Sequence, residues 1–161
     1  MRTTTPVLPS PTLVGKLIAG LVGRQVVADK VPPPALDLTR PNTVAAYVRD
    51  SGIVGAVAVC DLSLSAHLGA ALALVPARVA REAVADGALP EDLVENHREI
   101  VNVAARVFNR PNLPHVKLRD VDVTPAALPG DVSGMLTTFD ERLAMEIEIE
   151  GYGTGTMWMF A

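Results

Sequence analysis

The sequence predicts an α+β fold, in which helices pack on one antiparallel sheet. Three observations support this prediction. Apolar residues recur at helical spacing in several segments, a continuous apolar run at Ile53–Cys60 is typical of a covered central strand, and Arg142–Glu150 alternates apolar and polar residues. The chain has 161 residues, of which 49% are apolar, so it is long and apolar enough to form a single domain with its own core.

The first third is expected to contain one helix, one strand and one hairpin. Residues 1–10 hold Thr and Pro and predict a loose, flexible N-terminal arm, which leaves 11–161 as the domain. Pro11–Arg24 carries an apolar stripe at helical spacing, and Gln25–Val31 is a short β-rich run ended by prolines. Thr43–Asp50 and Ile53–Cys60 flank a tight turn, which predicts a hairpin.

Two helices should follow the hairpin. Asp61–Leu74 looks helical, and Ser63 or Ser65 could cap it. Residues 76–87 read as a second helix that ends at Gly87.

The C-terminal third should consist of strands. Residues 115–124 alternate, with one slip near Asp120 that suggests a bulge. After a Pro/Gly loop, Met135–Phe139 is a further candidate strand. Arg142–Glu150 and Thr154–Phe160 then predict an antiparallel hairpin with one face in solvent.

The most informative stretch is Glu91–Asn109, which predicts one helix with two different faces. Pro90 suits the first helical position and Pro111 the stop. At about 100° per residue, the core-facing side holds Leu93, His97, Ile100, Val101, Ala104, Val107 and Phe108. The opposite, polar side holds Glu95, Glu99, Asn102, Arg106 and Asn109.

Composition and motifs argue against several classes of function. The net charge is −4 and no basic run occurs, so nucleic acid is not an expected partner. The single Cys60 gives neither a disulfide nor a cysteine metal cluster, the three histidines lack ligand spacing, and no G-x-S-x-G motif occurs. No leader or bilayer-length apolar run is visible, so we expect a soluble cytoplasmic protein without a metal site or a cofactor of its own.

Glu99 and Asn102 therefore become the candidate site. They stand at positions i and i+3, which places their Cβ atoms about 5–6 Å apart on one helix face. A carboxylate and a carboxamide in this arrangement can contact the same external group. Spacing alone, however, is more typical of a solvated helix face.

At these residues the chain resembles the CheC/CheX/FliY family of chemotaxis phosphatases. The family motif is Asp or Ser, three residues, Glu, two residues, Asn, and a proline about twenty-two residues farther on. Glu95, Glu99, Asn102 and Pro125 take these places. Two departures are visible: Glu95 replaces the preferred Asp or Ser, and Arg106 stands where glycine is frequent. The single motif is more similar to the CheX type than to the two-site CheC type.

The resemblance implies a CheX-like domain that hydrolyses the aspartyl-phosphate of a response-regulator receiver domain in two-component signalling. Asn102 would orient the attacking water, Glu99 would pair with the receiver's lysine, and Glu95 would support the contact. Arg106 would either hinder docking or recognise a different partner. Mg²⁺ would be held by the receiver, and relatives of the CheX type also pair as homodimers.

Two alternatives stay open. The two departures from the motif suit a non-catalytic adaptor that binds a receiver or another partner on the same fold. A small-molecule-binding α+β domain is the third alternative, although no convergent polar pocket can be recognised in the sequence.

Overall fold

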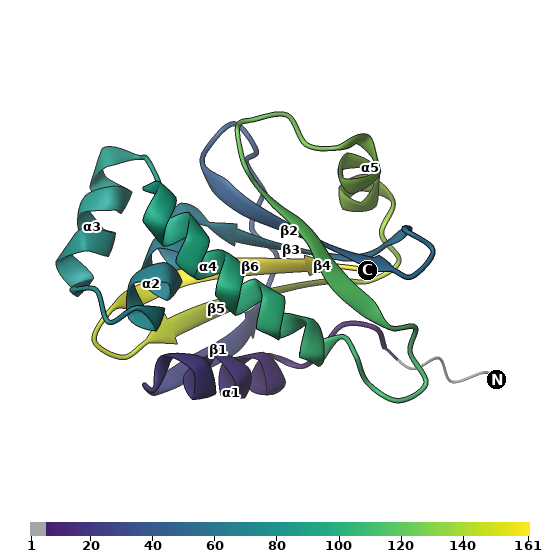
Figure 1. The fold of residues 1–161 in the computed structure, drawn as a ribbon, viewed down its shortest axis with the longest axis horizontal. Coiled ribbons are helices and arrows are strands. Elements are labelled where there is room, and N and C mark those ends of the chain that lie inside the picture. Colours follow the sequence, from purple (N-terminus) through teal and green to yellow (C-terminus); the bar gives the residue numbers. More distant parts are fainter. Residues whose placement is uncertain (1–5) are drawn as a thin grey trace.

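The computed structural model describes residues 6–161, and these form a single six-stranded sheet with helices on both faces (Figure 1). The strand order is β1-β5-β6-β3-β2-β4, and every neighbouring pair is antiparallel. The strands are β1 (Val26–Val31), β2 (Asn42–Arg49), β3 (Val54–Asp61), β4 (Val116–Val123), β5 (Arg142–Ile149) and β6 (Gly153–Phe160). The predicted α+β class with an antiparallel sheet is confirmed.

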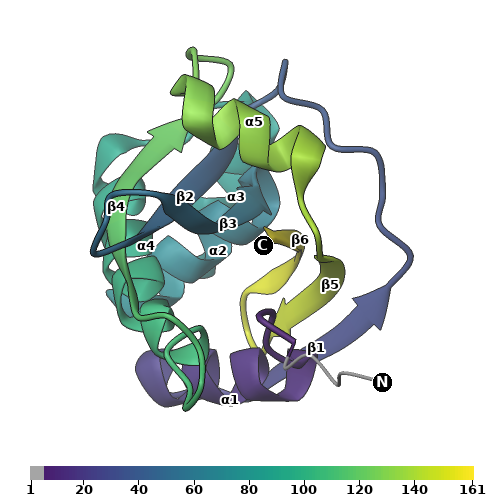
Figure 2. The same cartoon turned by 90° about the vertical axis from the view of Figure 1, so that its right-hand side faces the viewer.

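The helices divide unequally between the two faces. They are α1 (Pro11–Val22), α2 (Leu62–Leu72), α3 (Ala77–Asp86), α4 (Glu91–Val103) and α5 (Gly130–Thr138). Helices α1, α2 and α4 cover one face, while α5 packs on the other, as the turned view in Figure 2 shows. Helix α3 lies against α2 at the end of the sheet. None of the helices in residues 6–161 is long and apolar enough to cross a bilayer.

The core therefore has two layers, one on each side of the sheet. The helical side buries Tyr47, Met145 and Ile147 with the inner faces of α1, α2 and α4. The other side buries Val57 and Trp158, together with residues of α5. The central strand β3 is covered on both faces, as its apolar run predicts, whereas β5 alternates buried and solvent-exposed residues.

Several predicted details are also confirmed. The helix from residue 11, the two hairpins and the helix that ends at Gly87 are all present. The slip near Asp120 is a bulge in β4: Ala46 pairs with Asp120 and Tyr47 with Leu118, so Arg119 is left without a partner in the register.

Four predictions about local structure are wrong. Met135–Phe139 is not a strand, because residues 130–138 form α5. Asp61 caps α2 in place of Ser63 or Ser65, since its carboxylate accepts from the Leu64 N–H at 2.8 Å. Pro90 is the N-cap residue of α4 and not its first helical residue. Helix α4 itself ends at Val103 and tightens into a 3-10 turn over Ala104–Val107.

The N-terminal segment also differs from the expected loose arm over the part that can be described. Residues 1–5 lie outside the described residues. Residues 6–10 are held on the domain: the Glu141 carboxylate accepts from the Val7 and Leu8 amides at 3.0 Å, and Arg110 donates to the carbonyls of Pro6 and Val7. Leu8 is buried in the helical-side core.

Candidate functional site

Helix α4 packs on the helical face of the sheet, where it contacts β2 directly, with α2 along one flank and β4 beside the other (Figure 1). Its inner side buries four residues, Leu93, His97, Ile100 and Val101. All four belong to the side that the helical spacing predicts to face the core. The opposite side of α4 therefore faces solvent.

The residues named from the motif lie on that solvent side. Glu95, Glu99, Asn102 and Arg106 are all exposed. Within residues 6–161, no intramolecular hydrogen bond or ion pair occupies these four side chains. A carboxylate and a carboxamide one helical turn apart are thus available to an external group.

Two other residues named from the sequence, Asn109 of the expected polar face and Pro125 of the motif, lie elsewhere. Asn109, expected on the polar face, is half-buried beyond the 3-10 turn, where its amide side chain bonds both backbone groups of Val116 at 2.8 Å. This is a correction, and its cause is the early end of the α-helix. Pro125 is exposed in the turn that follows β4.

Helix α4 is attached closely to α2 through Gly69. The Asn96 side chain donates to the Gly69 carbonyl at 3.0 Å. A Cβ atom on Gly69 would lie 2.5 Å from the Leu93 carbonyl oxygen, so the two helices approach at a distance that only glycine permits. On the other flank Arg98 lies 3.6 Å from Asp120 of β4, an exposed pair that contributes little.

A buried chain of hydrogen bonds connects α4 to the sheet through His97. His97 Nε2 lies 2.8 Å from Thr43 Oγ1, which lies 2.9 Å from Ser65 Oγ. Ser65 donates to the Asp61 carbonyl at 2.8 Å, so it must accept from Thr43. Thr43 then accepts from His97, which assigns the proton of the neutral ring to Nε2.

This arrangement explains the pKa of His97. Burial lowers it from 6.5 to about 4. Protonation would place a second N–H at Nδ1, which is buried and has no hydrogen-bond partner among residues 6–161. His97 is therefore a neutral structural group and not an acid–base catalyst.

A second buried contact holds the end of α4. The Tyr47 hydroxyl donates to the Val101 carbonyl at 2.6 Å, and the Tyr47 ring lies 4.9 Å from that of Phe108. Tyr47 and Thr43 could not be predicted as partners of α4, because each is 54 positions from the residue that it bonds. The sequence did contain one indication: both are hydroxyl residues within a mostly apolar strand. Buried hydroxyl groups require hydrogen-bond partners inside the protein.

The other candidates from the sequence do not assemble into a site. His67 is buried and His115 exposed, and in the described part of the chain no three His, Cys, Asp or Glu residues lie close enough to hold a metal. Cys60 is buried, and burial raises the pKa of its thiol. The glycines of residues 151–156 belong to the turn and first residues of the β5–β6 hairpin.

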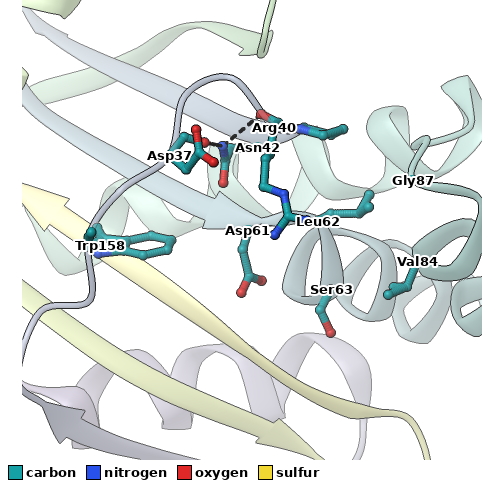
Figure 3. A pocket seen from close by; sticks show the side chains of 11 residues that line it. Asp37, Arg40, Asn42, Asp61, Leu62, Ser63, Val84, Gly87 and Trp158 are labelled. Atoms are coloured by element: carbon teal, nitrogen blue, oxygen red, sulfur yellow. Dashed lines mark hydrogen bonds between the residues drawn. The ribbon is translucent and has the colours of Figure 1, made fainter.

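A cavity of about 430 Å³ lies at the start of α2, between the segment 35–42 and the sheet (Figure 3). Its walls include Asp37, Arg40, Asp61 and Trp158. Helix α4 contributes no residue to it. The exposed pair on α4 is therefore separate from this cavity, and its open position suits the surface of another protein.

Comparison with known proteins identifies the fold. No family model and no curated protein sequence matches the chain. Among solved structures, FliM from a FliM–SpeE complex of H. pylori matches with a TM-score of 0.63 at 7% identity, over 93% of this chain and 80% of that one. The chain has the FliM and FliY fold.

Two further structures agree with this identification of the fold. The FliM middle domain from Vibrio alginolyticus has a TM-score of 0.59 at 8% identity and covers 94% of this chain and 87% of that one. FliY from Thermotoga maritima has a TM-score of 0.56 at 14% identity and covers 99% and 91%. The expected resemblance is confirmed at the level of the fold. Because the sequence identities are this low, the activity has to be argued from the side chains of the site.

Proposed function

We propose that this protein hydrolyses the aspartyl-phosphate of a response-regulator receiver domain. The observation that carries the proposal is the pair Glu99 and Asn102, which are exposed together and have no side-chain partner in the described residues, on a helix that hydrogen bonds hold in place. The FliM and FliY fold supports it, because FliY belongs to the family whose motif these residues match.

The proposed reaction requires few catalytic groups from this chain. In an acyl phosphate the phosphorus is already activated, so the main task is to place water in line with the bond that breaks. The water oxygen bonds to phosphorus while the bond from phosphorus to the aspartyl oxygen breaks. The products are the free aspartate and dihydrogen phosphate, which keeps both water protons. The Asn102 amide can donate and accept, and so can orient that water.

The remaining residues of the face would govern docking. Glu99 would pair with the receiver's lysine, Glu95 would support that contact, and Arg106 would contact the partner beside Asn102. The receiver would supply Mg²⁺, and this chain is proposed to bind no cofactor of its own. Pairing as a homodimer, as in CheX-type relatives, is part of the same proposal.

The second candidate is a non-catalytic adaptor that binds a receiver or another protein through the same face. Glu95 and Arg106 favour it, since both depart from the phosphatase pattern. FliM structures of the same fold are complexes with SpeE and with FliG, which supports partner binding as a use of this fold. The adaptor predicts binding without turnover.

The test compares phosphate loss from phosphorylated receiver domains of the same organism, with and without the protein. We expect the wild type to accelerate the loss and Asn102→Ala to reduce that acceleration by about 100-fold or more, the scale that misplacing a reacting group produces. Glu99→Ala should mainly weaken docking and raise KM.

The control is Glu148→Ala, which removes a similar exposed carboxylate from β5. It should leave turnover unchanged. If Asn102→Ala retains wild-type turnover, the mechanism is wrong. If receivers bind but lose no phosphate faster, the adaptor is the function.

A further inference from the structure

Tyr47 is a fully buried residue of β2 whose hydroxyl has one specific contact with the site helix. It donates to the Val101 carbonyl at 2.6 Å, and its ring packs against Phe108. Ring packing alone would be served equally well by phenylalanine. Ring packing therefore does not account for the hydroxyl group. Its direct effect is to hold the backbone of α4 at Val101.

The position of that contact along the helix matters. Val101 immediately precedes Asn102, the α-helix ends at the next residue, Val103, and the 3-10 turn begins at Ala104. The last turn of a helix lacks a full set of backbone partners and frays readily. A phenol bonded to a carbonyl of this turn restrains the turn that presents the Asn102 amide.

Thr43 makes the corresponding contact on the same strand. It lies on the same face of β2 as Tyr47 and bonds His97, one helical turn before Val101. The two bonds attach the site helix to β2 at successive turns, with Glu99 between them and Asn102 directly after the second. The Tyr47 bond is the one nearer to Asn102 along the chain, because Val101 immediately precedes Asn102.

We infer that Tyr47 is a positioning residue for Asn102. By holding the Val101 carbonyl, Tyr47 fixes the direction of the Asn102 side-chain amide. The inference rests on the proposed phosphatase function. Tyr47 itself is buried and touches neither the receiver nor the phosphate, so it acts on the rate of the chemical step and not on docking.

The test uses Tyr47→Phe, which removes the hydroxyl and keeps the ring. The matched control is Tyr152→Phe, because the Tyr152 hydroxyl donates to the Val75 carbonyl at 2.8 Å, a bond of the same kind far from the site. Both variants are assayed for phosphate loss from a phosphorylated receiver, and amide hydrogen exchange is followed over residues 101–107.

For Tyr47→Phe we expect kcat to fall at least tenfold with KM within twofold of wild type, and exchange over residues 101–107 to accelerate at least tenfold. Tyr152→Phe should change none of these by more than twofold. Unchanged kcat in Tyr47→Phe, or an equal loss in both variants, overturns the inference.

Amide hydrogen exchange distinguishes a failure of this inference from a failure of the proposed function. If the wild-type protein has no phosphatase activity, the proposed function fails on its own. The restraint on residues 101–107 is then decided by exchange alone, and unchanged exchange in Tyr47→Phe shows that the hydroxyl does not position this turn.

Discussion

Residues close together in the sequence of α4 have opposite environments. His97 is buried in a hydrogen-bonded chain, while Glu99 and Asn102 project into solvent. Helical periodicity was sufficient to predict this division, because each residue turns the helix by about 100°. The partners of His97 could not be predicted, since Thr43 and Ser65 come from other elements and their side chains meet only in the folded chain.

His97 should make stability depend on pH. Its folded pKa of about 4 lies below the ordinary 6.5, so between these values the unfolded chain binds the extra proton. The free energy of unfolding should therefore fall as the pH drops from about 6.5 to 4, by about 3 kcal/mol in total. Urea unfolding at pH 7.5 and pH 5 checks this, and about 2 kcal/mol of the loss should already be present at pH 5.

The control variant is His97→Gln, whose amide can still donate to Thr43 but does not titrate. It should lose less stability over the same pH range than the wild type. Burial also lowers the pKa of His67, which leaves some pH dependence in the variant. Identical pH profiles for both proteins would refute the assignment of this effect to His97.

Substitutions of a buried and of an exposed residue near the C-terminal end of α4 should have very different effects on stability. Phe108→Ala removes a buried ring that packs on Tyr47 and should cost about 3–5 kcal/mol. Asn102→Ala changes an exposed position without a partner and should cost less than about 0.5 kcal/mol. Urea unfolding of the two variants checks the contrast, and similar losses in both would show that Asn102 has a structural role.

At the scale of elements, α5 shows where local sequence misleads. Residues 130–138 contain two glycines and several β-branched residues, which favour a strand or loop over a helix. The segment is nevertheless helical, because Val132, Met135, Leu136 and Phe139 pack on the second face of the sheet. Their i, i+3, i+4, i+7 spacing was visible in the sequence and outweighs the weak propensity.

The contact between α2 and α4 depends on Gly69. Gly69→Ala places a Cβ atom 2.5 Å from the Leu93 carbonyl oxygen, so α4 must shift outward. We expect a loss of about 1–3 kcal/mol, the usual cost of overpacking, measured by urea unfolding. The shift should also reduce activity at the site on α4.

Gly20 provides the matched comparison, because it lies in α1 with no atom near its would-be Cβ. Gly20→Ala should raise stability by up to about 1 kcal/mol through helix propensity alone. If Gly69→Ala is also stabilising, the close helix approach does not exist in solution.

At the scale of the whole molecule, the class of fold was predictable and the strand order was not. The β2–β3 and β5–β6 hairpins follow from short turns between β-rich runs. The pairing of β1 with β5 joins residues more than a hundred positions apart, and β4 returns to lie beside β2. Such long-range pairing leaves no local signal, so it was visible only in the folded chain.

The same architecture places the site. Helix α4 packs on α2 and on the sheet by its inner side alone, so the opposite side with Glu95, Glu99 and Asn102 is exposed. A convex, exposed helix suits a protein partner better than a small molecule. This is the basis on which we favour a protein substrate over a small molecule.

The most direct test is the rate at which a phosphorylated receiver loses phosphate at saturating concentrations of wild-type protein and of Asn102→Ala. We predict a ratio of about 100 or more between the accelerations that the two proteins produce. A ratio near one, with both proteins folded and bound to the receiver, would contradict the account.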